Sequence, residues 1–435
     1  MVVQHNLQAM NANRMLNITT GSQSKSAEKL SSGYRINRAA DDAAGLSISE
    51  KMRKQIRGLD QASTNAEDGV SAVQTAEGAL TEVHSMLQRM NELAVQASNG
   101  TNSKTDRDAI QSEIDQLTTE IDRVAETTKF NETYLLKGDA NGATKDVYMK
   151  GHDAGLKGEL IDGATTATFK VAAGALDDGK KVTIGGKEYT IGSKDDTVKA
   201  LIIAPTGTTK NKVTIDGVDY EIDKDSKIYK AGSTTPLTKK DFGGADADAA
   251  GLTELKALVK GGAKVSIDGK DYTIMKDVDG DEVDDADSST ILATKAVELM
   301  TAELTTANNI GATKTAATIA AGTTYASATG ATFNITKGTA EVAEKLNFNL
   351  HVGSDADMTN KINVNIETMD SSYLGIKGLN VSDDTGVAAT YAVDAIADAL
   401  QKVSDQRSSL GAVQNRLEHT IANLDNVVEN TTSAE

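Results

Sequence analysis

Apolar residues at both ends of the chain recur at the alternating steps of three and four that mark a coiled-coil seam. One seam runs along Val70, Val73, Ala76, Leu80, Val83, Leu87, Met90, Ala94 and Ala97. Asn99-Gly100 ends this predicted helix, and a second helix follows with Ser103 or Thr105 as its N-cap. The second seam comprises Ile110, Ile114, Leu117, Ile121 and Val124. The C-terminal seam comprises Ile396, Leu400, Val403, Leu410, Leu417, Ile421, Leu424 and Val428, with polar Arg407 and Gln414 between them.

None of these predicted helices can bury its stripe of apolar residues by itself. Each fully buried aliphatic side chain contributes about 1.5–3 kcal/mol, so the stripes are stable only against one another. The simplest arrangement returns the C-terminal helix onto the two N-terminal ones and makes the middle of the chain an insertion. We therefore predict an α+β fold built on a long antiparallel, coiled-coil-like helical bundle.

The middle of the chain, by contrast, reads as β-structure. The segments Lys181–Ile191, Lys212–Ile222 and Lys264–Ile274 resemble one another, and each predicts a hairpin with a two-residue turn. The turn pairs are Gly185-Gly186, Asp216-Gly217 and Asp268-Gly269, which tolerate the positive φ that such turns need. Residues 140–343 are thus predicted to form a β-rich insertion, with helical patches near Ala250–Val259 and Ile291–Leu304.

Strand-like alternation returns after the insertion. Apolar residues alternate at Leu346, Phe348 and Leu350 and again at Ile362, Val364 and Ile366, with a turn between the two runs. We predict that this hairpin belongs to the helical domain and not to the insertion.

The composition of the chain excludes several classes of function. The 435 residues include no cysteine, which excludes disulfides, thiolate metal sites and a cysteine nucleophile. A formal charge of −18 disfavours nucleic-acid binding. The N-terminus does not read as a secretory signal peptide, and no stretch has the apolar length of a membrane span, so export would follow a route without a cleaved signal.

Catalytic motifs are absent from the sequence. Asp277-Val-Asp-Gly-Asp281 superficially resembles a calcium loop, but its glycine is misplaced and Ser288 stands at the twelfth position, so we interpret it as a solvated acidic loop. The five histidines form no His-Glu-x-x-His pattern, and no Gly-x-Ser-x-Gly elbow occurs. We predict no catalytic residue, no metal and no cofactor: the chain is not expected to be an enzyme.

Three motifs carry a family resemblance. They are Leu30–Leu46 (LSSGYRINRAADDAAGL), Gln88–Gln96 (QRMNELAVQ) and Gln406–Leu417 (QRSSLGAVQNRL). Together they resemble bacterial flagellins over roughly residues 1–138 and 344–435. The resemblance implies a secreted structural subunit that polymerises into the extracellular flagellar filament for motility after type III export.

The resemblance also implies an architecture and partners. Residues 1–42 would form the filament-core helix and connector, residues 43–139 and 344–435 the helical bundle, and residues 140–343 the variable outer insertion. The expected partners are other copies of the chain, the flagellar cap and junction proteins, and an export chaperone. Two alternatives stay open: a hook–filament junction protein, and an adhesin or glycan-binding role in the insertion.

In flagellins, a further helix that pairs with the N-terminal one follows a run such as Asn430–Glu435. The present sequence stops at Glu435, so we expect a truncated chain. The N-terminal helix would then lack its partner, its seam residues Leu7, Met10 and Leu16 would be exposed, and addition to filament seeds would fail.

Two groups of residues are candidate sites under this resemblance. Arg35, Asn37, Arg38 and Asp42 would make contacts between subunits, although the same segment can be read as a connector with capping residues. The host Toll-like receptor that senses flagella would bind five residues: Gln88, Arg89, Leu93, Gln96 and Glu113. Arg89 and Leu93 are neighbours on one helix, but Leu93 can equally be plain core.

Overall fold

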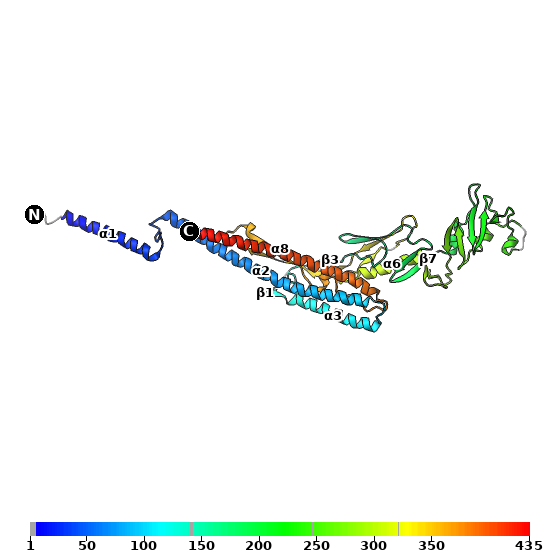
Figure 1. Cartoon of the computed structure of the whole chain (residues 1–435), viewed down its shortest axis with the longest axis horizontal. Coiled ribbons are helices and arrows are strands. Elements are labelled where there is room, and N and C mark those ends of the chain that lie inside the picture. The colour runs from blue at the N-terminus through cyan, green and yellow to red at the C-terminus, as the bar shows by residue number, and fades with distance from the viewer. Residues whose placement is uncertain (1–5, 140–141, 245–247, 321) are drawn as a thin grey trace. The chain divides into compact units, whose positions relative to one another are not determined.

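The computed structural model describes residues 6–139, 142–244, 248–320 and 322–435 (Figure 1). The chain divides into two compact units. The first contains the residues up to Thr75 with Asn347–Asn365 and Ser408–Glu435, and the second contains Ala76–Leu346 and Ile366–Arg407. Two long helices, α2 (Ala43–Ala97) and α8 (Val387–Ala434), contribute to both units. The three-part division into core segment, bundle and insertion stays a prediction.

The first helix of the first unit, α1 (Leu7–Ser32), has no buried residue. Asn6 accepts a hydrogen bond from the N–H of Ala9 at 3.1 Å, and Gly33 ends the helix at a φ of 73°. Leu7, Met10 and Leu16 are 74%, 64% and 63% exposed, so the expected exposure of this seam is confirmed.

Helices α2 and α8 run antiparallel and pack together in each unit. In the first unit Arg53 forms an ion pair with Glu435 at 2.7 Å, and Ser63 donates to Asp425 at 3.2 Å. In the second unit Arg407 lies 3.6 Å from Glu77. The residue numbers of the contacting residues fall along α8 as they rise along α2. This order confirms the predicted antiparallel bundle.

A two-stranded sheet packs on these helices in the first unit. Its strands are β17 (Leu346–His351) and β18 (Lys361–Ile366), joined by a turn that includes the 3₁₀ helix η2 (Met358–Asn360). Ile362 is buried in one cluster with Ala66 of α2 and Leu417 of α8, and Leu350 packs against them. The prediction that the hairpin belongs to the helical part is confirmed.

In the second unit α3 (Lys104–Thr127) joins the bundle. Ser103, not Thr105, is its N-cap, and Ser103 and Asp106 form a capping box. The predicted seams supply the core. Fully buried members include Leu80, Leu87 and Met90 of α2, Ile114 and Ile121 of α3, and Ile396 and Val403 of α8. The short strands β1 (Lys129–Phe130) and β2 (Thr133–Tyr134) follow α3, and α7 (Ser371–Leu374) precedes α8.

The described residues of the insertion form four sheets. A five-stranded sheet has the order β10-β9-β8-β11-β12, a three-stranded sheet β13-β7-β6, a four-stranded sheet β14-β15-β5-β4, and a pair joins β16 to β3. The strands before residue 200 are β3 (Thr144–Tyr148), β4 (Glu159–Asp162), β5 (Thr166–Val171), β6 (Lys181–Ile184) and β7 (Lys187–Gly192). Those of the five-stranded sheet are β8 (Asn211–Ile215), β9 (Val218–Ile222), β10 (Ile228–Lys230), β11 (Lys264–Ile267) and β12 (Lys270–Thr273). The later strands are β13 (Thr290–Leu292), β14 (Thr318–Ile319), β15 (Ala331–Thr336) and β16 (Thr339–Ala343).

Four helical elements accompany these sheets in the part of the insertion that the structure describes. They are α4 (Asp195–Leu201), η1 (Lys239–Phe242), α5 (Leu252–Lys256) and α6 (Ala293–Asn308). Helix α5 lies within the first predicted helical patch, and α6 overlaps the second and extends four residues beyond it. Helix α6 packs in one core with Phe169 and Phe333, while Leu255 of α5 packs in the core of the five-stranded sheet.

All three predicted hairpins form, each with positive φ at both turn residues. The second and third hairpins pair with each other through β8 and β11. Asp216 of one turn accepts a hydrogen bond from the N–H of Lys264 at 3.0 Å, and Asp268 of the other accepts from Lys212 at 3.1 Å. The first hairpin has Gly185 in place of the aspartate and lies in a different sheet. A Cβ at Gly185 would lie 2.5 Å from Oε1 of Glu303, so a larger residue there would displace the end of that side chain.

Gly69 lets the hairpin approach α2 closely. A Cβ at Gly69 would lie 2.2 Å from Cδ1 of Leu350 and 3.3 Å from Cδ1 of Leu417. We expect Gly69→Ala to destabilise the protein by about 1–3 kcal/mol, because overpacking outweighs the helix-propensity gain. Urea unfolding followed by circular dichroism measures this.

Gly78 on the same helix has nothing within 4 Å of its hypothetical Cβ and is the matched control. Gly78→Ala should stabilise by about 0.5–1 kcal/mol. Equal effects of the two substitutions would contradict the close approach at Gly69.

Candidate functional site

Arg89 joins α2 to α3 on the surface of the second unit. Its Nε donates to Oε1 of Glu113 at 2.9 Å, and a terminal nitrogen donates to Glu92 at 3.2 Å. The Arg89 side chain remains 50% exposed and that of Glu113 46%. The hydrogen bond to Glu113 raises the pKa of the Arg89 guanidinium above its ordinary value, so the group is a fixed positive charge.

The other predicted receptor residues divide between surface and core. Gln88 and Gln96 are exposed on α2, and Nε2 of Gln88 lies 3.2 Å from Nε2 of His84. Leu93 is only 2% exposed, so its position is that of the core alternative. Val95 is not among the predicted residues, yet it is 53% exposed. An apolar residue that lies off the seam of its helix indicates such an exposed position.

A buried arginine on α3 holds the end of the bundle beside this surface. Arg107 is 2% exposed, and its Nε donates to the carbonyl oxygen of Ala97 at 2.8 Å. Its two terminal nitrogens donate to the carbonyls of Asn99 at 3.2 Å and Asp384 at 3.1 Å. The guanidinium therefore supplies a donor to the carbonyl of Ala97, the last residue of α2, and joins it to the loop at Asn99 and to the segment before α8.

Arg107 is not among the residues predicted from the sequence, although its position carries a signal. It stands three residues before Ile110, where the seam of α3 extends by one step, and a charge on a seam needs partners. Gly386, at a φ of 82°, permits the close approach, since a Cβ there would lie 3.0 Å from the guanidinium.

The predicted assembly residues lie in the connector between α1 and α2, in the first unit. Arg38 pairs with Glu28 of α1 at 3.0 Å, and the Asn37 amide donates to Oγ of Ser32 at 2.7 Å. Arg35 is exposed, and among the described residues it has no hydrogen-bond or ion-pair partner.

Aspartates at positions 41 and 42 shape this connector. Asp41 accepts from the backbone N–H groups of Asn37 and Arg38, and the bond from Arg38 lowers the pKa of its carboxyl. Asp42 accepts from the N–H of Gly45 at 2.9 Å at the start of α2. The capping interpretation therefore describes Asp42, while Arg35 is left facing solvent.

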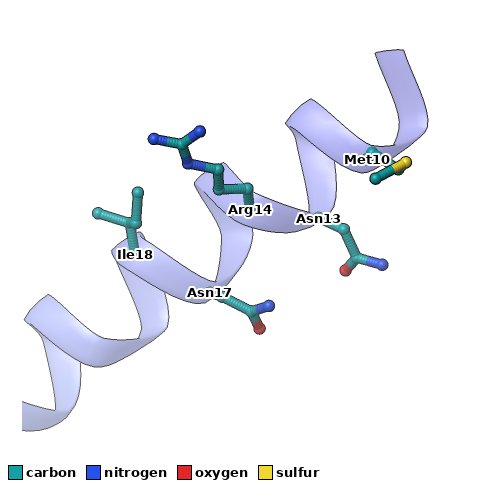
Figure 2. A pocket seen from close by; sticks show the side chains of 5 residues that line it. All are labelled: Met10, Asn13, Arg14, Asn17 and Ile18. Atoms are coloured by element: carbon teal, nitrogen blue, oxygen red, sulfur yellow. The ribbon is translucent and has the colours of Figure 1, made fainter. Parts of the chain in front are cut away.

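The described parts of the chain contain no enclosed pocket with converging side chains that would bind a small ligand. Three carboxylates, those of Asp277, Asp279 and Asp281, lie within 4.8 Å of one another, and Asp277 and Asp279 accept hydrogen bonds from their own loop. Among the helices that the structure describes, none has the length and apolar character needed to cross a membrane. Figure 2 shows a shallow hollow lined by Met10, Asn13, Arg14, Asn17 and Ile18, but all five project from α1 alone and do not converge.

Comparison with known proteins agrees with the geometry. Residues 3–141 match the family described as "Bacterial flagellin N-terminal helical region", and residues 393–435 match "Bacterial flagellin C-terminal helical region". The flagellin of Clostridium tyrobutyricum is 38% identical over 440 residues, which cover 100% of this chain and 90% of that protein. The flagellin of Salmonella typhimurium is 34% identical over 460 residues (98% and 90%), and flagellin D of Vibrio cholerae is 30% identical over 436 residues (99% and 87%).

A helical bundle made from both chain ends around a β-rich insertion, with these full-length matches, defines a structural protein of the bacterial flagellum. The chain belongs to the bacterial flagellin family, whose members polymerise into the extracellular flagellar filament for motility. It is a structural protein and not an enzyme. Between the filament subunit and the junction-protein alternative, the family match decides for the filament subunit.

The contacts of Arg107 predict a clear effect of its removal. Arg107→Met should destabilise the protein by about 1–3 kcal/mol, because the carbonyl of buried Ala97 loses its donor and a buried carbonyl without a donor costs about that much. Hydrogen exchange should show earlier opening at the end of α2 and the start of α8, and urea unfolding gives the free energy.

The control is Arg123→Met, also on α3, where the exposed arginine pairs with Glu120 and with no other described residue. That variant should unfold like the parent. A parent-like Arg107→Met protein would show that the buried guanidinium is dispensable.

Proposed function

We propose that the α2–α3 surface around Arg89 is recognised by the host Toll-like receptor that senses bacterial flagella. The observation that supports this is the rigid presentation of Arg89: two carboxylates on two helices hold a half-exposed guanidinium in place. A side chain ordered before binding loses little conformational entropy on association.

The surroundings of Arg89 suit a binding hot spot. Gln88 and Gln96 provide exposed hydrogen-bonding groups, and Val95 provides an exposed apolar surface on the same helix. Arginine beside an apolar contact is a common hot-spot arrangement at interfaces. Leu93, buried beneath this surface, contributes by fixing α2 in the bundle and not by direct contact.

We also propose that the connector carries contacts between subunits. Arg35 is the direct contact, because it faces solvent, while Asn37, Arg38 and Asp42 hold the connector in shape. Residues 1–42 would form the filament core, residues 43–139 and 344–435 the bundle, and residues 140–343 the outer part. Cap proteins, junction proteins and an export chaperone are the further partners under this proposal.

Removal of the Arg89 side chain tests the receptor surface. Arg89→Ala should weaken binding to the receptor ectodomain by about tenfold or more, as expected for a hot-spot arginine. Surface plasmon resonance measures the Kd, and circular dichroism should show unchanged helix content. Arg123→Ala, another exposed and ion-paired arginine, should bind like the parent. Equal binding of both variants would rule out Arg89 as a hot spot.

Charge reversal at Arg35 tests the assembly proposal. With Arg35→Glu placed in the chromosomal gene, we expect loss of filaments and secretion of folded monomer, because a like charge replaces an attractive one at the contact. Electron microscopy scores filaments, and circular dichroism of the secreted protein scores folding. Lys230→Glu, the same reversal at the exposed residue of β10, should leave filaments intact. Normal filaments with Arg35→Glu would refute the contact.

A further inference from the structure

Strand β6 has an unused edge. It lies at the end of the order β13-β7-β6, and within the described ranges no strand pairs with its outer side. Ile184 and Lys187 flank the two-residue turn and so exchange both backbone hydrogen bonds. The alternation of an antiparallel ladder then turns the N–H and C=O of Thr183 away from β7. Thr183 is exposed, as expected for a group that faces solvent.

The other two hairpins show how the same edge is used within the chain. Strands β8 and β11 occupy the position of β6 in their own repeats, and they pair antiparallel with each other. Thr214 lies opposite Ser266, and these two residues correspond to Thr183 in the first repeat. On either side, the valine of one strand lies opposite the isoleucine of the other. The pairing therefore has a local two-fold axis at its centre.

We propose that the outer edge of β6 pairs antiparallel with β6 of a second copy of this chain, in the register that β8 and β11 use. Thr183 then lies opposite Thr183 of the second copy, and Val182 lies opposite Ile184. An antiparallel pair of identical strands is an isologous contact, which two-fold symmetry closes. Two three-stranded sheets become one continuous sheet across two subunits.

The charges on β6 are compatible with this contact. In the proposed register Lys181 lies opposite Gly185 of the second copy and not opposite another lysine, so like charges do not meet. Lys181 is also held by Glu188 of its own hairpin at 2.6 Å. Gly185 has no carboxylate to repeat the caps that Asp216 and Asp268 provide, so the contact between copies is weaker than the one within the chain.

Other edges in the insertion are less open. Strand β4 ends in Asp162, which forms an ion pair with Lys337 at 2.6 Å. Charged side chains at the edge of a sheet disfavour pairing with a further strand. The outer strands of the five-stranded sheet also form bridges: Ile274, just after β12, bridges to Ser193, and Tyr229 within β10 bridges to Pro236. Strand β6 thus combines a free edge with a sequence that already pairs elsewhere in the chain.

The absence of cysteine permits a direct test, since a single introduced thiol can form a disulfide only with another copy. Residues opposite each other in a hydrogen-bonded antiparallel pair have Cα atoms about 5.5 Å apart, within disulfide reach. Oxidation of the Thr183→Cys protein with copper phenanthroline should give dimers on non-reducing gels, at a rate that rises with protein concentration.

Two controls test the strand and its register. Glu188→Cys, at an exposed position of β7, would lie about 14 Å from its copy, three strand spacings away. Lys181→Cys on β6 itself would also lie about 14 Å from its copy along the antiparallel strands. Both should crosslink at least tenfold more slowly than Thr183→Cys. The double variant Thr214→Cys, Ser266→Cys should form a disulfide within the monomer, because it traps the template pairing.

The outcomes separate clearly. Fast dimer formation at position 183 alone supports the proposed pairing. Equal rates at positions 183 and 188 indicate random collision, and equal rates at 183 and 181 indicate a parallel or slipped contact; either result overturns the proposal. Circular dichroism of each variant confirms that the fold is retained.

Discussion

The antiparallel packing of α2 on α8 is the interaction on which the rest of the structure depends. Neither helix buries its aliphatic stripe alone, and together they bring residues near both ends of the sequence into contact, as at Arg53 and Glu435. The hairpin of β17 and β18 packs on both helices, and α3 adds a third seam. Because the bundle is closed in this way, the insertion begins and ends on a stable support and is free to have a different fold.

The end of the bundle also needs hydrogen-bond donors, since the last carbonyls of a helix have no partner within the helix. Arg107 supplies donors to the end of α2 and to the segment before α8 with one buried guanidinium. Its five donors make arginine suited to this task. The α2–α3 surface that presents Arg89 therefore rests on a connection that is fixed, which is what a recognition surface with low entropic cost requires.

In the insertion, three similar hairpins pair with different strands. Aspartates in the second and third turns cap each other's strands, and glycine in the first turn leaves room for Glu303. The first turn residue thus differs between the two hairpins that pair with each other, which have aspartate there, and the hairpin with a free edge, which has glycine. In a protein whose family polymerises, a free edge with a self-complementary sequence is a potential contact between copies.

The sequence alone determined the helical seams, the hairpin turns and the antiparallel return of the C-terminal helix, because these follow from periodicity and from turn residues that act locally. It also selected Arg89 and the connector residues through family motifs. Only the tertiary structure decided that Leu93 is core and Val95 is surface, since small rotations of a helix move neighbouring positions across the boundary. It also decided the partners of Arg107 and the pairing of β8 with β11. Those contacts join residues far apart in the chain, and their geometry depends on how whole elements pack.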